Sequence, residues 1–100
     1  HGVMPIFATT YRYAADSTEA RDATRPEHRA YLAELTDAGR LVISGPYVGE
    51  PAGALLLFDA ESQEDAQRLT DADPFVTEGL VAEVTVQEWT PVSGRLAPQF

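Results

Sequence analysis

The sequence predicts one small α+β domain with the element order β-α-β-β-α-β. Its 100 residues suit a single domain. Four stretches have the composition of strands, the first of them rich in β-branched and aromatic residues, and two stretches between them carry apolar residues at helical spacing. We expect the domain to occupy residues 4–90 and an irregular tail to follow at residues 91–100. Residues 1–3 precede Met4, the only methionine, and are expected to be a remnant of cloning.

The strands are predicted from their composition and from the turn residues that bound them. The third is apolar throughout, as a strand buried on both faces is. The last alternates apolar and polar residues, which is typical of a half-buried strand. The turn residues Ser44, Gly45 and Pro46 are expected to halt the second strand. The four expected strands cover residues 3–13, 41–43, 54–58 and 80–89.

The first helix is predicted to begin at Thr24. Residues 14–23 are small and polar, so we expect a connection there with at most one helical turn. Thr24 suits an N-cap, Pro26 falls in the first turn and Glu27 stands where a capping box needs it. The helix should run to about residue 38 and stop at Gly39. Its buried stripe at helical spacing is expected to be Tyr31, Leu32, Leu35 and Ala38.

The second helix is predicted to begin after Ser62, a suitable N-cap. Glu64 and Asp65 follow in its first turn, where negative charge is favoured. Asp73-Pro74 should end this helix, because the residue before a proline avoids helical angles. Asp73 shares one face of this helix with Ala66 and Leu69, so it is expected on the inward face, at the C-terminal end.

The element order places both helices on one face of a four-stranded antiparallel sheet. The other face should be polar in a monomer. It is not, because neighbouring strand residues that point to opposite faces are both apolar, as in the pairs Ile6-Phe7 and Val42-Ile43. We therefore expect a homodimer, sheet face against sheet face with two-fold symmetry. The alternative is that the tail at residues 91–100 folds under the sheet.

Composition excludes several classes of function. The chain has 7 Arg, no Lys and 16 Asp plus Glu, so its formal net charge of −9 disfavours nucleic acids and anionic membranes. It has no Cys, which excludes thiol chemistry and disulfides. No stretch is apolar over the roughly 20 residues of a membrane span. With no signal peptide in the sequence, we expect a cytoplasmic protein.

His28 and Asp73 are the candidate reactive groups. His28 shares a helix face with Tyr31, Leu32 and Leu35, so it should point inward, where a polar ring needs a partner. Asp73 is a carboxylate on an apolar helix face and would supply that partner. An Asp–His pair fixes the tautomer and suits general acid–base catalysis near neutral pH. The alternatives are a structural histidine and an Asp-Pro turn.

Other side chains are candidates for binding a substrate. Ser44 completes a nominal Ser/His/Asp set, but the nucleophile-elbow pattern is absent, so it is assigned to substrate binding with Gly45 and Pro46. Arg25 and Arg29 flank His28 and could attract an anion. The aromatic residues that could line a pocket are Tyr11, Tyr13, Tyr47, Phe75 and Trp89, of which Tyr11 and Phe75 are preferred. No metal site is expected, because the carboxylates lack ligand spacing.

An ordered series of landmarks from about residue 5 to residue 89 resembles the YciI-like family. The landmarks are Arg25-Pro26-Glu27-His28, Leu32, Gly39-Arg40-Leu41, Ser44-Gly45-Pro46, Ala72-Asp73-Pro74-Phe75 and Gly79-Leu80. The resemblance implies the ferredoxin-like fold of the dimeric α+β barrel proteins. It also implies a cleft with a histidine and an aspartate as active residues, which fall on His28 and Asp73. The connection at residues 47–53 is shorter than in many relatives.

The resemblance implies lyase- or isomerase-like chemistry on small hydroxylated rings, some of them chlorinated, without a cofactor. The sequence itself carries no nucleotide motif. Our hypothesis is a cofactor-independent enzyme that uses His28 and Asp73 on a small organic molecule, hydroxyaromatic or lactone-like. The alternatives are a binding module without chemistry and a purely structural domain. Haem ligation by His28 is the least favoured hypothesis, because no feature of the sequence indicates a haem pocket.

Overall fold

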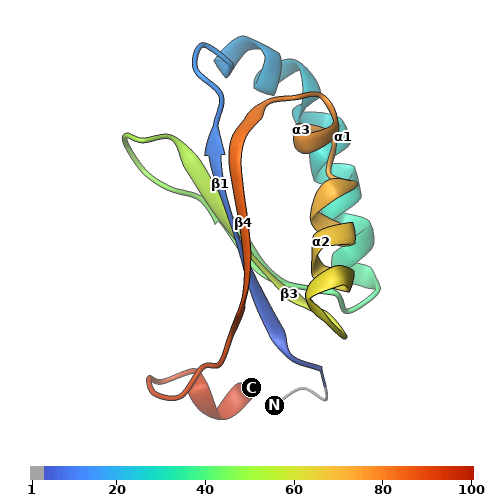
Figure 1. Ribbon diagram of the computed structural model, residues 1–100, viewed down its shortest axis with the longest axis vertical. Coiled ribbons are helices and arrows are strands. Elements are labelled where there is room, and N and C mark those ends of the chain that lie inside the picture. The colour runs from blue at the N-terminus through green and yellow to red at the C-terminus, as the bar shows by residue number, and fades with distance from the viewer. Residues whose placement is uncertain (1–3) are drawn as a thin grey trace.

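The computed structural model describes residues 4–100, so the expected cloning remnant at residues 1–3 lies outside the described residues. Its sheet has the strand order β2-β3-β1-β4, with every neighbouring pair antiparallel. Figure 1 shows α1 and α2 packed on one side of this sheet. The predicted α+β, ferredoxin-like fold is confirmed. The elements are β1 (Ile6–Tyr13), α1 (Thr18–Asp37), β2 (Leu41–Pro46), β3 (Gly53–Asp59), α2 (Gln63–Asp71), α3 (Pro74–Thr77), β4 (Val81–Trp89) and the 3-10 turn η1 (Ala97–Gln99).

The core lies between the sheet and the helices. Alternate residues of β1 face the helices, and the side chains of Phe7, Thr9 and Tyr11 are at most 2% exposed. Leu56 and Phe58 of β3 are equally buried on the same face, since β3 pairs with β1 in register. Each large apolar side chain buried in this way stabilises the fold by roughly 1.5–3 kcal/mol. The core therefore fixes the positions of β1 and β3, which carry one wall of the site described below.

Helix α1 starts earlier than predicted, and the prediction of a capping box at Thr24 is wrong. The helix begins at Thr18 with Ser17 as its N-cap residue, and it continues through Pro26. The Ser17 hydroxyl donates to the Ala14 carbonyl (2.7 Å) and accepts from Nε of Arg21 (2.9 Å). Residues 18–23 include good helix formers, and they extend the helix ahead of the proline despite the hydrogen bond that proline removes. The predicted stop at Gly39 is confirmed by its positive φ of 76°.

Asp73 also lies in a different local setting from the one predicted. Helix α2 ends at Asp71, and Asp73 is the N-cap of the short helix α3, where its side chain accepts a hydrogen bond from the Phe75 N–H. The carboxylate therefore stands at a helix N-terminus, where negative charge is favoured, and not at the unfavourable end of α2. The second strand was predicted to halt at Ser44, and this is wrong, because β2 continues through Ser44 and Gly45 to Pro46.

The tail at residues 91–100 covers only part of the open face of the sheet. Figure 1 shows it beyond one end of the strands. Its residues line a hollow together with Ile43, Leu57 and Trp89, and Leu57 is only 9% exposed. Ile43 nevertheless remains 63% exposed and Trp89 44% exposed. Among residues 4–100, no helix lies on this face, and no helix is long and apolar enough to cross a membrane.

A charged network ties the start of α2 to the end of the loop after α1. Ser62 caps α2 as predicted, accepting from the Asp65 N–H (3.1 Å). The buried carboxylate of Asp65 accepts from the Glu61 N–H (2.9 Å) and from the guanidinium groups of Arg40 and Arg68. The backbone hydrogen bond, together with the two cations, lowers the pKa of Asp65 against the opposing effect of its burial.

Replacing Asp65 should destabilise the fold in a pH-dependent way. We expect Asp65→Asn to lower the free energy of unfolding by about 1–3 kcal/mol at pH 7, because charge-assisted hydrogen bonds are lost. The pKa of folded Asp65 is lowered. The difference should therefore be fully present above about pH 4 and shrink as the pH falls below it. Urea unfolding at a series of pH values measures this. The exposed neighbour Glu64→Gln is the control, and an equal effect there would contradict the assignment.

Candidate functional site

The carboxylate of Asp73 is fully buried, and three donors from three elements satisfy it. It accepts from the Tyr11 hydroxyl of β1 at Oδ2 (2.7 Å) and from the Phe75 N–H of α3 at Oδ1 (3.0 Å). Nδ1 of His28 on α1 lies 2.7 Å from the same Oδ1. A buried charge is stable only with such partners.

This network fixes the tautomer of His28. An ionised carboxylate can only accept hydrogen bonds, so Nδ1 of His28 carries the proton that it shares with Asp73. In the neutral ring Nε2 is then the free nitrogen, with its lone pair available as an acceptor or base. We assign this state from the hydrogen-bond network.

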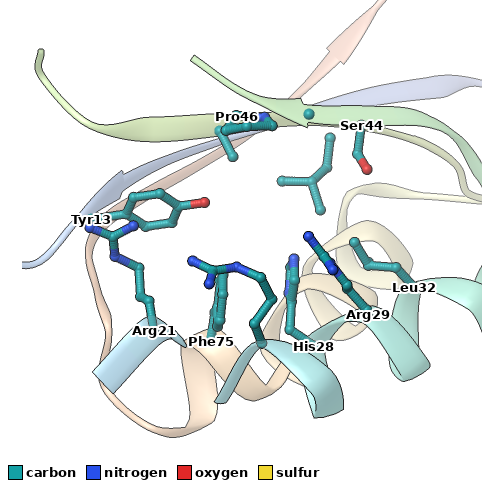
Figure 2. Close-up of a pocket in the computed structure, with 12 residues that line it drawn as sticks. Tyr13, Arg21, His28, Arg29, Leu32, Ser44, Pro46 and Phe75 are labelled. Carbon is teal, nitrogen blue, oxygen red and sulfur yellow. The ribbon is translucent and has the colours of Figure 1, made fainter. Parts of the chain in front are cut away.

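Ring contacts hold the imidazole in place. The rings of His28 and Phe75 are stacked, with centroids 3.9 Å apart and planes within 3°. The ring of Tyr13 packs edge-on against that of Phe75, with the two centroids 5.9 Å apart. The His28 side chain keeps 15% of its surface exposed, and Figure 2 shows the imidazole pointing into a cavity. The free nitrogen of a fixed imidazole is therefore open to a small molecule.

The cavity lies between α1, α3 and the strand ends of β1, β2 and β3. Its volume is about 290 Å³, at the lower end of the range for ligand pockets, which suits a molecule about the size of one substituted ring. Figure 2 shows the side chains that surround it. They are Tyr13, Arg21, Arg25, His28, Arg29, Leu32, Ser44, Gly45, Pro46, Ala54, Leu56 and Phe75.

The charge around the cavity is positive. Arg21, Arg25 and Arg29 line it from successive turns of α1, and no Asp or Glu is among the lining residues. The guanidinium of Arg25 pairs with Asp22 at 2.5 Å, and that of Arg21 lies 4.1 Å from the centroid of the Tyr13 ring. Burial raises the pKa of Tyr13, so its phenol is neutral at physiological pH. The cavity thus favours an anionic ligand although the whole chain is strongly acidic.

Most of the predicted site residues come together here. His28, Arg25, Phe75 and the segment Ser44-Gly45-Pro46 line the cavity, and Asp73 lies directly behind His28. Tyr11 was expected to bind substrate, but it is 1% exposed, is not among the lining residues and uses its hydroxyl on Asp73. Its aromatic character indicated a pocket, whereas its register on β1 places it in the core.

Some lining residues were not predicted. Arg21 was missed because residues 14–23 were expected to be a connection, which hid the spacing of four residues that links it to Arg25 and Arg29. Within residues 4–100 no hydrogen bond joins Ser44 to His28, so the nominal Ser/His/Asp set is not assembled. Tyr47 and Trp89 lie outside this cavity. The described part of the chain holds no group of three or more His, Cys, Asp or Glu that could bind a metal ion.

The fold and the site together define an α+β domain with a ferredoxin-like sheet, whose helix side holds a small cationic cavity beside a His–Asp pair. Residues 6–90 match the YCII-related domain family, and the chain belongs to that family.

Two bacterial proteins are similar in sequence over more than half of this chain. The chain is 38% identical over 87 residues to Protein YciI of Escherichia coli O6:H1, an alignment that covers 78% of this chain and 89% of that protein. It is 36% identical over 62 residues to the uncharacterized protein YjpA of Bacillus subtilis, covering 62% and 71%. A similar solved structure is 5-chloro-2-hydroxyhydroquinone dehydrochlorinase (TftG) of Burkholderia phenoliruptrix in complex with 2,5-dihydroxybenzoquinone. It has a TM-score of 0.75 and 26% identity, and the match covers 84% of this chain and 92% of that one.

The hydrogen bond from Tyr11 to Asp73 should make stability fall at alkaline pH. Burial and the neighbouring carboxylate of Asp73 raise the pKa of Tyr11 far above its ordinary value. We expect Tyr11→Phe to lower the free energy of unfolding by about 1–3 kcal/mol at pH 7. The difference should persist up to about pH 10 and shrink above it, because the unfolded tyrosine then ionises. Urea unfolding from pH 7 to 11 measures this, and a difference that grows above pH 10 would contradict it.

Proposed function

We propose that this chain is an enzyme that moves a proton on a small hydroxylated ring molecule, with His28 as the general acid–base group. The observation that carries the proposal is the 2.7 Å contact of His28 Nδ1 with the buried Asp73, which leaves the other ring nitrogen facing the cavity. Asp73 is then a positioning residue that holds the tautomer and stabilises the imidazolium that forms during the reaction.

The reaction class that suits this arrangement is elimination or isomerisation. Nε2 of His28 takes a proton from a hydroxyl or C–H group of the substrate. The released electron pair forms a double bond, and it either expels a leaving group from the same molecule or shifts an existing double bond. The imidazolium returns its proton to the product or to water. Proton transfer of this kind uses only the two side chains, so the proposed reaction needs no cofactor.

The class of substrate is supported by the size of the cavity and by a structural neighbour. A volume of about 290 Å³ suits a single substituted ring. The neighbour at 26% identity is a dehydrochlorinase of a chlorinated hydroxyhydroquinone. A dehydrochlorinase removes HCl from its substrate. We therefore propose a hydroxyaromatic or lactone-like substrate and a lyase or isomerase activity.

The test is a variant that keeps the contact with Asp73 and removes the base. In His28→Asn the amide nitrogen takes the place of Nδ1, while nothing replaces Nε2. We expect turnover of chlorinated hydroquinones, hydroxyquinones or lactones to fall by roughly 10²-fold or more, with the thermal unfolding temperature little changed. Steady-state kinetics over this panel measures it. Glu27→Gln, an exposed neighbour on the same helix turn, is the control and should keep full activity.

Two outcomes would count against this function. Full turnover in His28→Asn would remove His28 from the chemistry. Binding of panel compounds that raises the unfolding temperature, with no turnover of any of them by the wild-type protein, would favour a binding module instead.

We also propose that the protein works as a homodimer through the open face of the sheet. Ile43 and Trp89 are 63% and 44% exposed there, and the half-buried Leu55 points to the same face. Large apolar side chains exposed together on one sheet face are typical of an interaction surface. A second copy would cover it with the same residues, related by a two-fold axis.

A charge on the open face should disrupt this dimer. We expect wild-type protein to sediment as a dimer and Ile43→Glu to sediment as a monomer at the same concentration, because a buried carboxylate without a partner opposes association. Analytical ultracentrifugation measures it. Ala33→Glu places the same charge on an exposed position of α1 and should leave the dimer intact. A monomeric wild-type protein would refute the proposal.

A further inference from the structure

The arginines of the cavity are not equivalent, and their partners distinguish them. Arg25 is neutralised by Asp22 at 2.5 Å. Arg21 has no acidic partner, but its Nε donates to the Ser17 hydroxyl (2.9 Å) and its guanidinium covers the Tyr13 ring. Arg29 has neither an ion pair nor a hydrogen bond to any of residues 4–100. It therefore brings an uncompensated positive charge to the cavity wall.

Arg29 and His28 line the same cavity. Arg29 follows His28 on α1, and Figure 2 shows both side chains extending toward the same part of the cavity. In the same view Ser44 points its hydroxyl toward the cavity from β2, on the side where Arg29 lies. A planar guanidinium matches the two oxygens of a carboxylate, and a serine hydroxyl can donate a further hydrogen bond.

We infer that the ligand of this cavity carries a carboxylate bound by Arg29, separate from the group that reacts at His28. The inference rests on the proposed function for the identity of the reacting group, whereas the carboxylate contact concerns binding alone. One fixed negative charge suits Arg29, because it alone of the three cavity arginines has neither an ion pair nor a hydrogen bond to any of residues 4–100. Because the cavity lining contains no Asp or Glu, nothing in it opposes that charge.

The test compares two ligands that differ only in this charge. The probes are 2,5-dihydroxybenzoate and 2,5-dihydroxybenzamide, which share the ring and its hydroxyl groups. We expect the carboxylate to bind the wild-type protein about tenfold or more tightly than the amide, because its contact with Arg29 is charge-assisted. Isothermal titration calorimetry at pH 7.5 and low ionic strength measures both dissociation constants. The ratio should decrease in high salt.

Substitution at Arg29 should remove this preference. In Arg29→Gln we expect the ratio to fall to about one, mainly through weaker binding of the carboxylate. Arg95→Gln removes the same charge from an exposed side chain of the tail that lies outside this cavity, so it should keep the wild-type ratio. The exposed Arg29 has no partner to lose among the described residues, so Arg29→Gln should fold normally.

The outcomes separate this inference from the proposed function. His28→Asn should keep the preference for the carboxylate even though it loses turnover. Retention of the ratio in a protein that turns over no compound would uphold the carboxylate contact and reject the enzyme. Equal affinity for the two probes in wild-type protein, no measurable binding of the carboxylate at millimolar concentration, or an unchanged ratio in Arg29→Gln would each overturn the inference.

Discussion

The buried carboxylate of Asp73 holds together three parts of the chain that are far apart in sequence. It accepts hydrogen bonds from Tyr11 on β1, His28 on α1 and Phe75 on α3. Loss of one donor to such a buried charge is expected to cost about 1–3 kcal/mol, so the sheet, the long helix and the short helix are constrained by one group. The same constraint sets the proton on His28 and the position of its ring. The stability of the fold and the tautomer and orientation of His28 therefore depend on one side chain.

The β-α-β-β-α-β order followed from patterns that are local in the sequence. Strand β3 is a continuous apolar run, and Ser62 with Asp65 marks the start of α2, so both elements were predicted close to where they lie. The start of α1 was not, because Thr24, Pro26 and Glu27 form a plausible cap in isolation. Whether a helix begins before a proline depends on competing small energies, and here Ser17, with Ala14 and Arg21, decides the outcome.

The His28–Asp73 pair could be predicted, although each residue also had a structural alternative. A histidine and a carboxylate on inward helix faces each needed a partner, and pairing them satisfied both. Tyr11 and Arg21 could not be placed in the same way. The face that Tyr11 presents depends on the register of β1, and the contribution of Arg21 depends on a helical turn that the sequence did not predict. The pairing of His28 with Asp73 was therefore easier to predict from the sequence than the set of residues that line the cavity.

The chain concentrates positive charge where the rest of its surface is negative. Three of its seven arginines line one cavity, although the formal net charge is −9. The cavity lies on the helix side of the sheet, whereas the apolar residues Ile43 and Trp89 lie on the opposite side. The central strands stand between these two surfaces. The proposed self-association and the proposed ligand binding therefore use separate surfaces, so a substitution on one surface can change one property without the other.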